Sequence, residues 1–134
     1  MQEKLLNSLK TTLIDLDFKK DWIPEFIKYI EECIEKGAIL VILFGSRAKH
    51  DFHKDSDIDI LIVQPFVMTK DELMERIDKL DFLVFDVFED GLILYSDMDM
   101  DHVNYRLKAR KERFSLRRVK SGWNFDAAAE AAGI

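Results

Sequence analysis

The sequence predicts a single α+β domain in which helices and strands follow one another along 134 residues. Two observations carry this prediction: several stretches repeat apolar residues at helical spacing, and several shorter runs are largely apolar, as buried strands are. A chain of this length forms one hydrophobic core more readily than two. In order, we expect helices at 1–16 and 22–36, strands at 38–44 and 57–63, a helix at 70–80, strands at 82–88 and 92–95, and a helix at 101–120.

The helices are predicted by their apolar stripes and by the residues at their ends. Asp21 can cap the second helix, and Gly37 ends it. Thr69 followed by Glu72 forms a capping box that opens the third helix. Asp101 begins the last one, which is rich in Lys and Arg.

The strands are predicted by composition and by the turns beside them. Residues 38–44 are apolar throughout, which is typical of a strand covered on both faces. Residues 57–63 form a second strand, which ends before a proline. Glu89-Asp90-Gly91 predicts a tight turn that joins a strand at 82–88 to one at 92–95.

The composition is that of a packed protein in a reducing compartment. Of the residues, 48% are hydrophobic, and the single Cys33 excludes an internal disulfide. The longest apolar run, 38–44, is far shorter than the roughly 20 residues that a bilayer demands. We therefore expect a cytoplasmic protein without a membrane segment.

The charge of −6 is unevenly distributed along the chain. Residues 102–123 contain 8 Lys or Arg against the single acid Glu112, so the rest of the chain is strongly acidic. Two interpretations stay open: a basic contact surface for a partner, including RNA, or an ordinary solvated helix face.

The candidate chemistry lies between the first two strands. Side chains two apart on a strand share a face, so Asp57 and Asp59 project together and can bind Mg²⁺. Gly45 allows close approach of the backbone to a ligand, and Ser46 and Arg47 add donors suited to phosphate oxygens. Together these residues predict a site for a nucleoside triphosphate with its magnesium.

Asp86 is the third candidate carboxylate. It is the only polar residue of the apolar run 82–88, where an unpaired carboxylate is costly. On a strand beside Asp57 and Asp59, it could complete a two-metal site or accept the proton of an attacking hydroxyl.

The string Phe44-Gly-Ser-Arg-Ala-Lys, followed by Asp55-Ser-Asp-Ile-Asp, resembles the signature of the DNA polymerase β-type nucleotidyltransferase superfamily. Within it, the chain is most similar to the minimal nucleotidyltransferases, over about residues 39–95. The chain departs from that pattern at Lys49 and His50, where relatives often have Arg-Gly.

The resemblance implies a small mixed sheet flanked by helices, the nucleotidyltransferase fold. It also implies that Gly45 and Ser46 hold the triphosphate, that Asp57 and Asp59 hold magnesium, and that a later strand supplies a third carboxylate. The family pattern allows Asp81 for that third acid as well as Asp86. We choose Asp86 because its neighbours are all apolar. A single nucleotidyltransferase domain then covers 1–134, with helices at 1–36, a catalytic sheet core at 38–96 and a C-terminal helix at 101–121.

The resemblance further implies Mg²⁺-dependent transfer of a nucleoside monophosphate, AMP from ATP, to a hydroxyl group, with release of pyrophosphate. The acceptor implied by the family is a HEPN-domain ribonuclease, for which the chain would be the antitoxin. Two alternatives stay open: a binding module that neutralises a partner by occlusion, and a nucleotidyltransferase for a small molecule such as an aminoglycoside. Assembly into a homo-oligomer also stays open.

Overall fold

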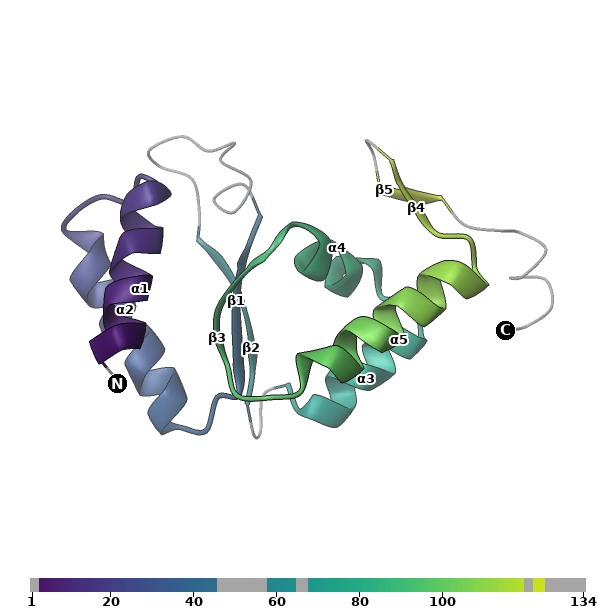
Figure 1. The fold of residues 1–134 in the computed structure, drawn as a ribbon, viewed down its shortest axis with the longest axis horizontal. Coiled ribbons are helices and arrows are strands. Elements are labelled where there is room, and N and C mark those ends of the chain that lie inside the picture. The colour runs from purple at the N-terminus through teal and green to yellow at the C-terminus, as the bar shows by residue number, and fades with distance from the viewer. Residues whose placement is uncertain (1–2, 46–57, 65–67, 120–121, 125–134) are drawn as a thin grey trace.

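The computed structural model describes residues 3–45, 58–64, 68–119 and 122–124. Ten elements follow one another along these segments (Figure 1). They are α1 (Glu3–Asp15), α2 (Trp22–Glu35), β1 (Leu40–Phe44), β2 (Asp59–Val63), α3 (Lys70–Asp78), α4 (Phe82–Asp90), β3 (Leu92–Ser96), α5 (Met100–Arg113), β4 (Arg117–Val119) and β5 (Gly122–Asn124).

A three-stranded sheet in the order β2-β1-β3 forms the centre of the fold. Phe44 pairs with Asp59 at one end of β1, and Leu40 pairs with Val63 and Ser96 at the other. The α+β class is confirmed, but both described pairings are antiparallel, whereas the resemblance implies a mixed sheet. The remaining strands, β4 and β5, form a separate hairpin.

Helices cover both faces of this sheet, with α1 and α2 on one side and α3, α4 and α5 on the other (Figure 1). Val41 and Leu43 belong to the core under α1 and α2, and Leu40 and Ile42 belong to the core under the other three helices. Alternating side chains of β1 therefore enter two cores. This explains why the strand is apolar at every position.

The strand expected at 82–88 is wrong, because these residues form helix α4. Asp81 caps the helix by accepting a hydrogen bond from the backbone N–H of Leu83. Val84 and Phe85 are buried against the sheet side, while Leu83 is 59% exposed. The sequence of a short apolar run fits a buried strand and a buried helix equally well. Here the Asp81 cap and the burial of Val84 and Phe85 stabilise the helix.

The hairpin expected at Glu89-Asp90-Gly91 is wrong for the same reason. Glu89 and Asp90 lie in the last turn of α4, and Gly91 follows as the residue at which the helix ends. A Cβ on Gly91 would collide with the carbonyl oxygen of Val87 and with the side chain of Ile42. Gly91 is therefore required for the close passage from α4 into β3.

The C-terminal helix is shorter than the expected 101–120. It ends at Arg113, and Ser115, with a φ of 50°, turns the chain toward the β4–β5 hairpin. At its start the cap is Asp99, which accepts hydrogen bonds from the N–H groups of Asp101 and His102.

The other predicted helix ends are close to the observed ones, although the side chain of Asp21, at the N-cap of α2, accepts no capping hydrogen bond. The Thr69 hydroxyl accepts a hydrogen bond from the N–H of Glu72, as the capping box requires. Gly37 follows the end of α2 with a φ of 97°. No helix among the described residues is long and apolar enough to cross a membrane.

Candidate active site

Gly45 and Asp59 lie side by side where β1 ends and β2 begins. Phe44 and Asp59 are paired across the two strands, and Gly45 follows Phe44 with a φ of 78°. A Cβ on Gly45 would collide with the carboxylate of Asp59. The glycine thus permits both the left-handed backbone and the position of the acid. Two predicted site residues are brought together at this corner.

The alternation predicted for β2 is confirmed over its described residues. Ile58, Ile60 and Ile62 pack against the core under α1 and α2, while Leu61 and Val63 belong to the opposite core. Asp59 is two residues from Leu61 and four from Val63, so its side chain points to the same face of the sheet as theirs. Its exposed carboxylate therefore lies on the face that α3, α4 and α5 cover further along the strand. The predicted site residues Ser46, Arg47 and Asp57 lie outside the described residues.

Asp86 is on helix α4 and not on a sheet strand. Its carboxylate accepts a hydrogen bond of 2.7 Å from the indole Nε1–H of Trp123, and it lies 3.4 Å from the guanidinium of Arg118. These partners offset the cost of a carboxylate in an apolar segment, which was the reason for assigning it to a metal. Its part in catalysis stays a prediction, now without the strand geometry that suggested it.

Asp81, the alternative third acid, caps α4. It accepts hydrogen bonds from the backbone of Leu83 at 3.1 Å and from Arg76 at 3.0 Å. Like Asp86, it lies on no strand of the sheet.

Trp123 and Arg118 were not singled out in the sequence, yet they connect the β4–β5 hairpin to α4. The Trp123 ring stacks on Phe82 at 6.5 Å and meets Phe85 edge to face at 5.8 Å. Arg118 also donates a 2.6 Å hydrogen bond to Asp90, which raises the pKa of the arginine. The available signal was the Ser121-Gly122 pair, a turn dipeptide between Val119 and Trp123.

The basic segment, residues 102–123, pairs in part with the protein's own acids. Arg106 and Arg110 both contact the carboxylate of Asp78 on α3, and Lys111 lies 2.7 Å from Glu89 on α4. The charge asymmetry of the sequence is thus partly balanced by ion pairs within the fold. Neither of the two interpretations given for these basic residues, a contact surface for a partner or a solvated helix face, includes such pairing.

A magnesium ion suits the chemistry of the predicted donors, since hard carboxylate oxygens are typical Mg²⁺ ligands. The described member of that pair, Asp59, is exposed, and its carboxylate lies against the Cα of Gly45, where a Cβ would collide with it. Among the described residues, no three His, Cys, Asp or Glu side chains are close enough together to hold a metal. Any site of that kind here requires Asp57 or another residue outside them.

The family model of the nucleotidyltransferase domain matches residues 23–88. This stretch runs from α2 to α4 and includes both Gly45 and Asp59. Over these residues the chain is similar to a nucleotidyltransferase domain, and its small α+β fold is consistent with a minimal nucleotidyltransferase of the DNA polymerase β-type superfamily. No curated protein and no solved structure matches the chain.

Proposed function

We propose that this protein transfers a nucleoside monophosphate, AMP from ATP, to a hydroxyl group and releases pyrophosphate. The observation that carries the proposal is the corner formed by Gly45 and Asp59 within the stretch that is similar to a nucleotidyltransferase domain. An exposed carboxylate beside a backbone that lacks a Cβ suits a metal-bound polyphosphate, because charge and close approach are supplied together.

Each predicted residue then has a distinct role. Asp57 and Asp59 would hold Mg²⁺ jointly with the substrate, and Gly45, Ser46 and Arg47 would bind the triphosphate oxygens. Bound magnesium would neutralise the charge that develops on the phosphates during transfer. In the transfer, the acceptor oxygen forms a bond to the α-phosphorus while the bond from that phosphorus to pyrophosphate breaks.

The test is the transfer of label from α-labelled ATP, with Mg²⁺ present, to an acceptor protein. Asp59→Asn keeps the side-chain shape and removes the charge, so we expect transfer to fall by about a hundredfold or more. Asp15→Asn, an equal change at an exposed position at the end of α1, is the matched control and should transfer normally. Equal transfer by the Asp59 variant would refute the proposal.

Asp86 enters the proposal as the third carboxylate, which accepts the proton of the attacking hydroxyl. Because Asp86 also accepts a hydrogen bond from Trp123, the effect of replacing Asp86 must be compared with that of a Trp123 variant that loses the same hydrogen bond. Transfer should be lost in Asp86→Asn and kept in Trp123→Phe. If both variants retain transfer, Asp86 is a structural residue only.

For the acceptor we propose a HEPN-domain ribonuclease, which the chain would modify as its antitoxin in the cytoplasm. The buried free thiol of Cys33 is compatible with that reducing compartment. Co-expression with such a ribonuclease should restore growth, and mass spectrometry should find the added AMP on a hydroxyl side chain. RNA contact through the basic segment is less favoured, because Arg106, Arg110 and Lys111 already pair with acids.

A second candidate is a binding module that neutralises its partner by occlusion. The observation that favours it is the engagement of Asp86 with Trp123 and Arg118, which leaves Asp59 as the described carboxylate of the candidate site. If Asp57→Ala/Asp59→Ala still neutralises the partner in cells, occlusion is the function. If neutralisation is lost while the complex still forms, transfer is the function.

A further inference from the structure

Strand β3 forms one edge of the sheet, because the strand order is β2-β1-β3 and β3 pairs only with β1 among the described strands. Its sequence, Leu92 to Ser96, contains no charged residue and no proline. Natural proteins commonly protect such edges with charges, prolines or a covering segment. An uncharged edge strand is therefore a ready surface for a further strand.

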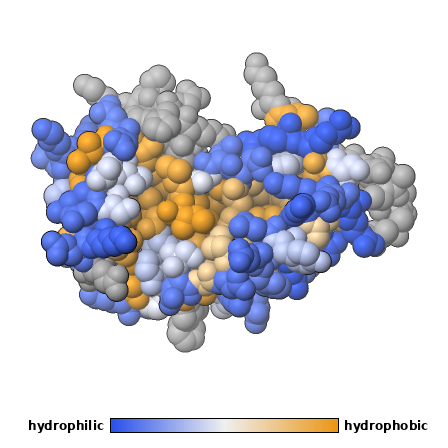
Figure 2. Space-filling model, viewed as in Figure 1, coloured by the Kyte–Doolittle hydropathy of each residue, from blue (hydrophilic) through white to orange (hydrophobic). Residues whose placement is uncertain are grey.

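The β3 edge is apolar at the surface. Ile93 is 50% exposed and Leu92 is 36% exposed. In the view of Figure 1, where β3 lies in front of β1, Figure 2 shows an apolar area in the middle of the face, between the hydrophilic surfaces of α1–α2 and α5. The edge strand thus lies within an apolar band with polar borders.

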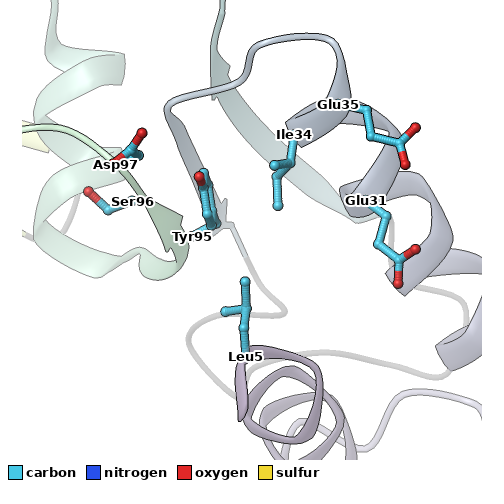
Figure 3. A pocket seen from close by; sticks show the side chains of 7 residues that line it. All are labelled: Leu5, Glu31, Ile34, Glu35, Tyr95, Ser96 and Asp97. Atoms are coloured by element: carbon cyan, nitrogen blue, oxygen red, sulfur yellow. The ribbon is translucent and has the colours of Figure 1, made fainter. Parts of the chain in front are cut away.

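A pocket of about 360 Å³ adjoins this band where β3 ends. Leu5, Ile34 and Tyr95 point toward its centre, from α1, α2 and β3 (Figure 3). The carboxylates of Glu31 and Glu35 lie on its α2 side, and Ser96 and Asp97 lie on its β3 side. The pocket has an apolar centre and an acidic rim.

The acids of this rim differ from those on the other face of the sheet. On that face, Arg or Lys side chains of the basic segment form ion pairs with Asp78, Glu89 and Asp90. Within the described part of the chain, no Lys, Arg or His forms an ion pair with the rim acids Glu31, Glu35 and Asp97. Glu31 and Glu35 are also four apart on one helix, an unfavourable spacing for like charges. A cation from outside would relieve that repulsion.

We propose that the β3 edge and this pocket bind an extended basic segment of a partner protein, which adds to the sheet as a strand next to β3. Its backbone would pair with the open edge, its apolar side chains would cover Leu92 and Ile93, and a Lys or Arg side chain would enter the pocket. A second copy of the chain fits less well, because each copy carries a charge of −6 and the same acidic rim.

The proposal does not rest on nucleotidyl transfer. The pocket lies at the Leu40 end of β1, and Gly45 follows its other end, roughly 16 Å away at about 3.3 Å per residue. Asp59→Asn should therefore leave binding at the β3 edge unchanged, which separates the two proposals experimentally.

The probe is a fluorescent, end-blocked peptide of four Lys-Val repeats, titrated with the full chain and followed by anisotropy. We expect saturable binding that weakens with salt, together with slower hydrogen exchange of the amides in β3. A peptide with Pro in place of Val keeps the charge but cannot pair as a strand, and it should bind at least about tenfold more weakly. No binding, or equal binding of both peptides, would overturn the proposal.

The charge contribution is tested by Glu31→Lys/Glu35→Lys, which should weaken binding about tenfold or more. Asp15→Lys/Glu32→Lys makes the same change of charge at exposed positions of α1 and α2 that do not line the pocket, and it should bind nearly as the parent does. Equal weakening by both pairs would indicate general attraction only and contradict the proposal. A dimer that Ile93→Lys dissociates would assign the edge to a second copy and overturn it as well.

Discussion

Replacing Gly45 with alanine tests whether the corner between β1 and β2 is built around the Asp59 carboxylate. The new Cβ carries two separate costs. A non-glycine residue in the left-handed region loses about 1 to 2 kcal/mol of stability, and the φ of Gly45 is 78°. The Cβ would also occupy the place of the carboxylate, whose displacement from its rotamer costs roughly 0.5 to 1.5 kcal/mol. We expect the free energy of unfolding to fall by about 2 to 3 kcal/mol in total.

A double-mutant cycle with Asp59→Ala separates these costs. Once the carboxylate is removed, only the backbone cost of Gly45→Ala should persist, so the coupling energy should be about 1 kcal/mol. Stability is measured by urea unfolding, and labelled-ATP transfer is measured on the same variants. Because a displacement of about 1 Å can cost a hundredfold in rate, we expect transfer by Gly45→Ala to fall by about that factor.

The matched control is Gly122→Ala. Gly122 also has a positive φ, 142°, but a Cβ there would meet no atom within 4 Å. This variant should lose stability and retain transfer. Zero coupling between Gly45 and Asp59, or normal transfer by Gly45→Ala, would refute the reasoning that the glycine exists to accommodate the carboxylate.

Further expectations concern the contacts that hold the helices and the hairpin. Trp123→Phe keeps an aromatic ring but loses the hydrogen bond to Asp86, so urea unfolding should show a loss of about 1 to 2 kcal/mol. Gly91→Ala should cost about 2 to 3 kcal/mol in the same assay, because its Cβ collides with backbone and with Ile42; a neutral result would mean that α4 does not enter β3 as described. Asp78→Asn removes the shared partner of two arginines, and because these side chains are about one third exposed, we expect less than about 1 kcal/mol, diminishing further in high salt.

The sequence alone determined the elements whose signals are local. The α1 and α2 stripes, the Thr69 cap and the uninterrupted apolar β1 each depend on spacing or on neighbours a few residues apart, and all of them are confirmed. The corner between Gly45 and Asp59 could also be predicted, since the Gly-Ser and Asp-Ile-Asp motifs stand at a recognisable spacing in the sequence.

From residue 82 onward the strand at 92–95 and the start of the last helix were predicted, but tertiary structure decided the form of residues 82–90 and the partners of their side chains. The apolar run at 82–88 has no period that separates strand from helix, and it is helical because Asp81 caps it and its buried side packs into the core with α3 and α5. Asp86 finds its partner Trp123 37 residues away, on strand β5 of a hairpin that meets α4 only when the chain folds back. Contacts of that range leave no mark in local spacing, which is why the residue that stood out as unpaired in the sequence is paired in the fold.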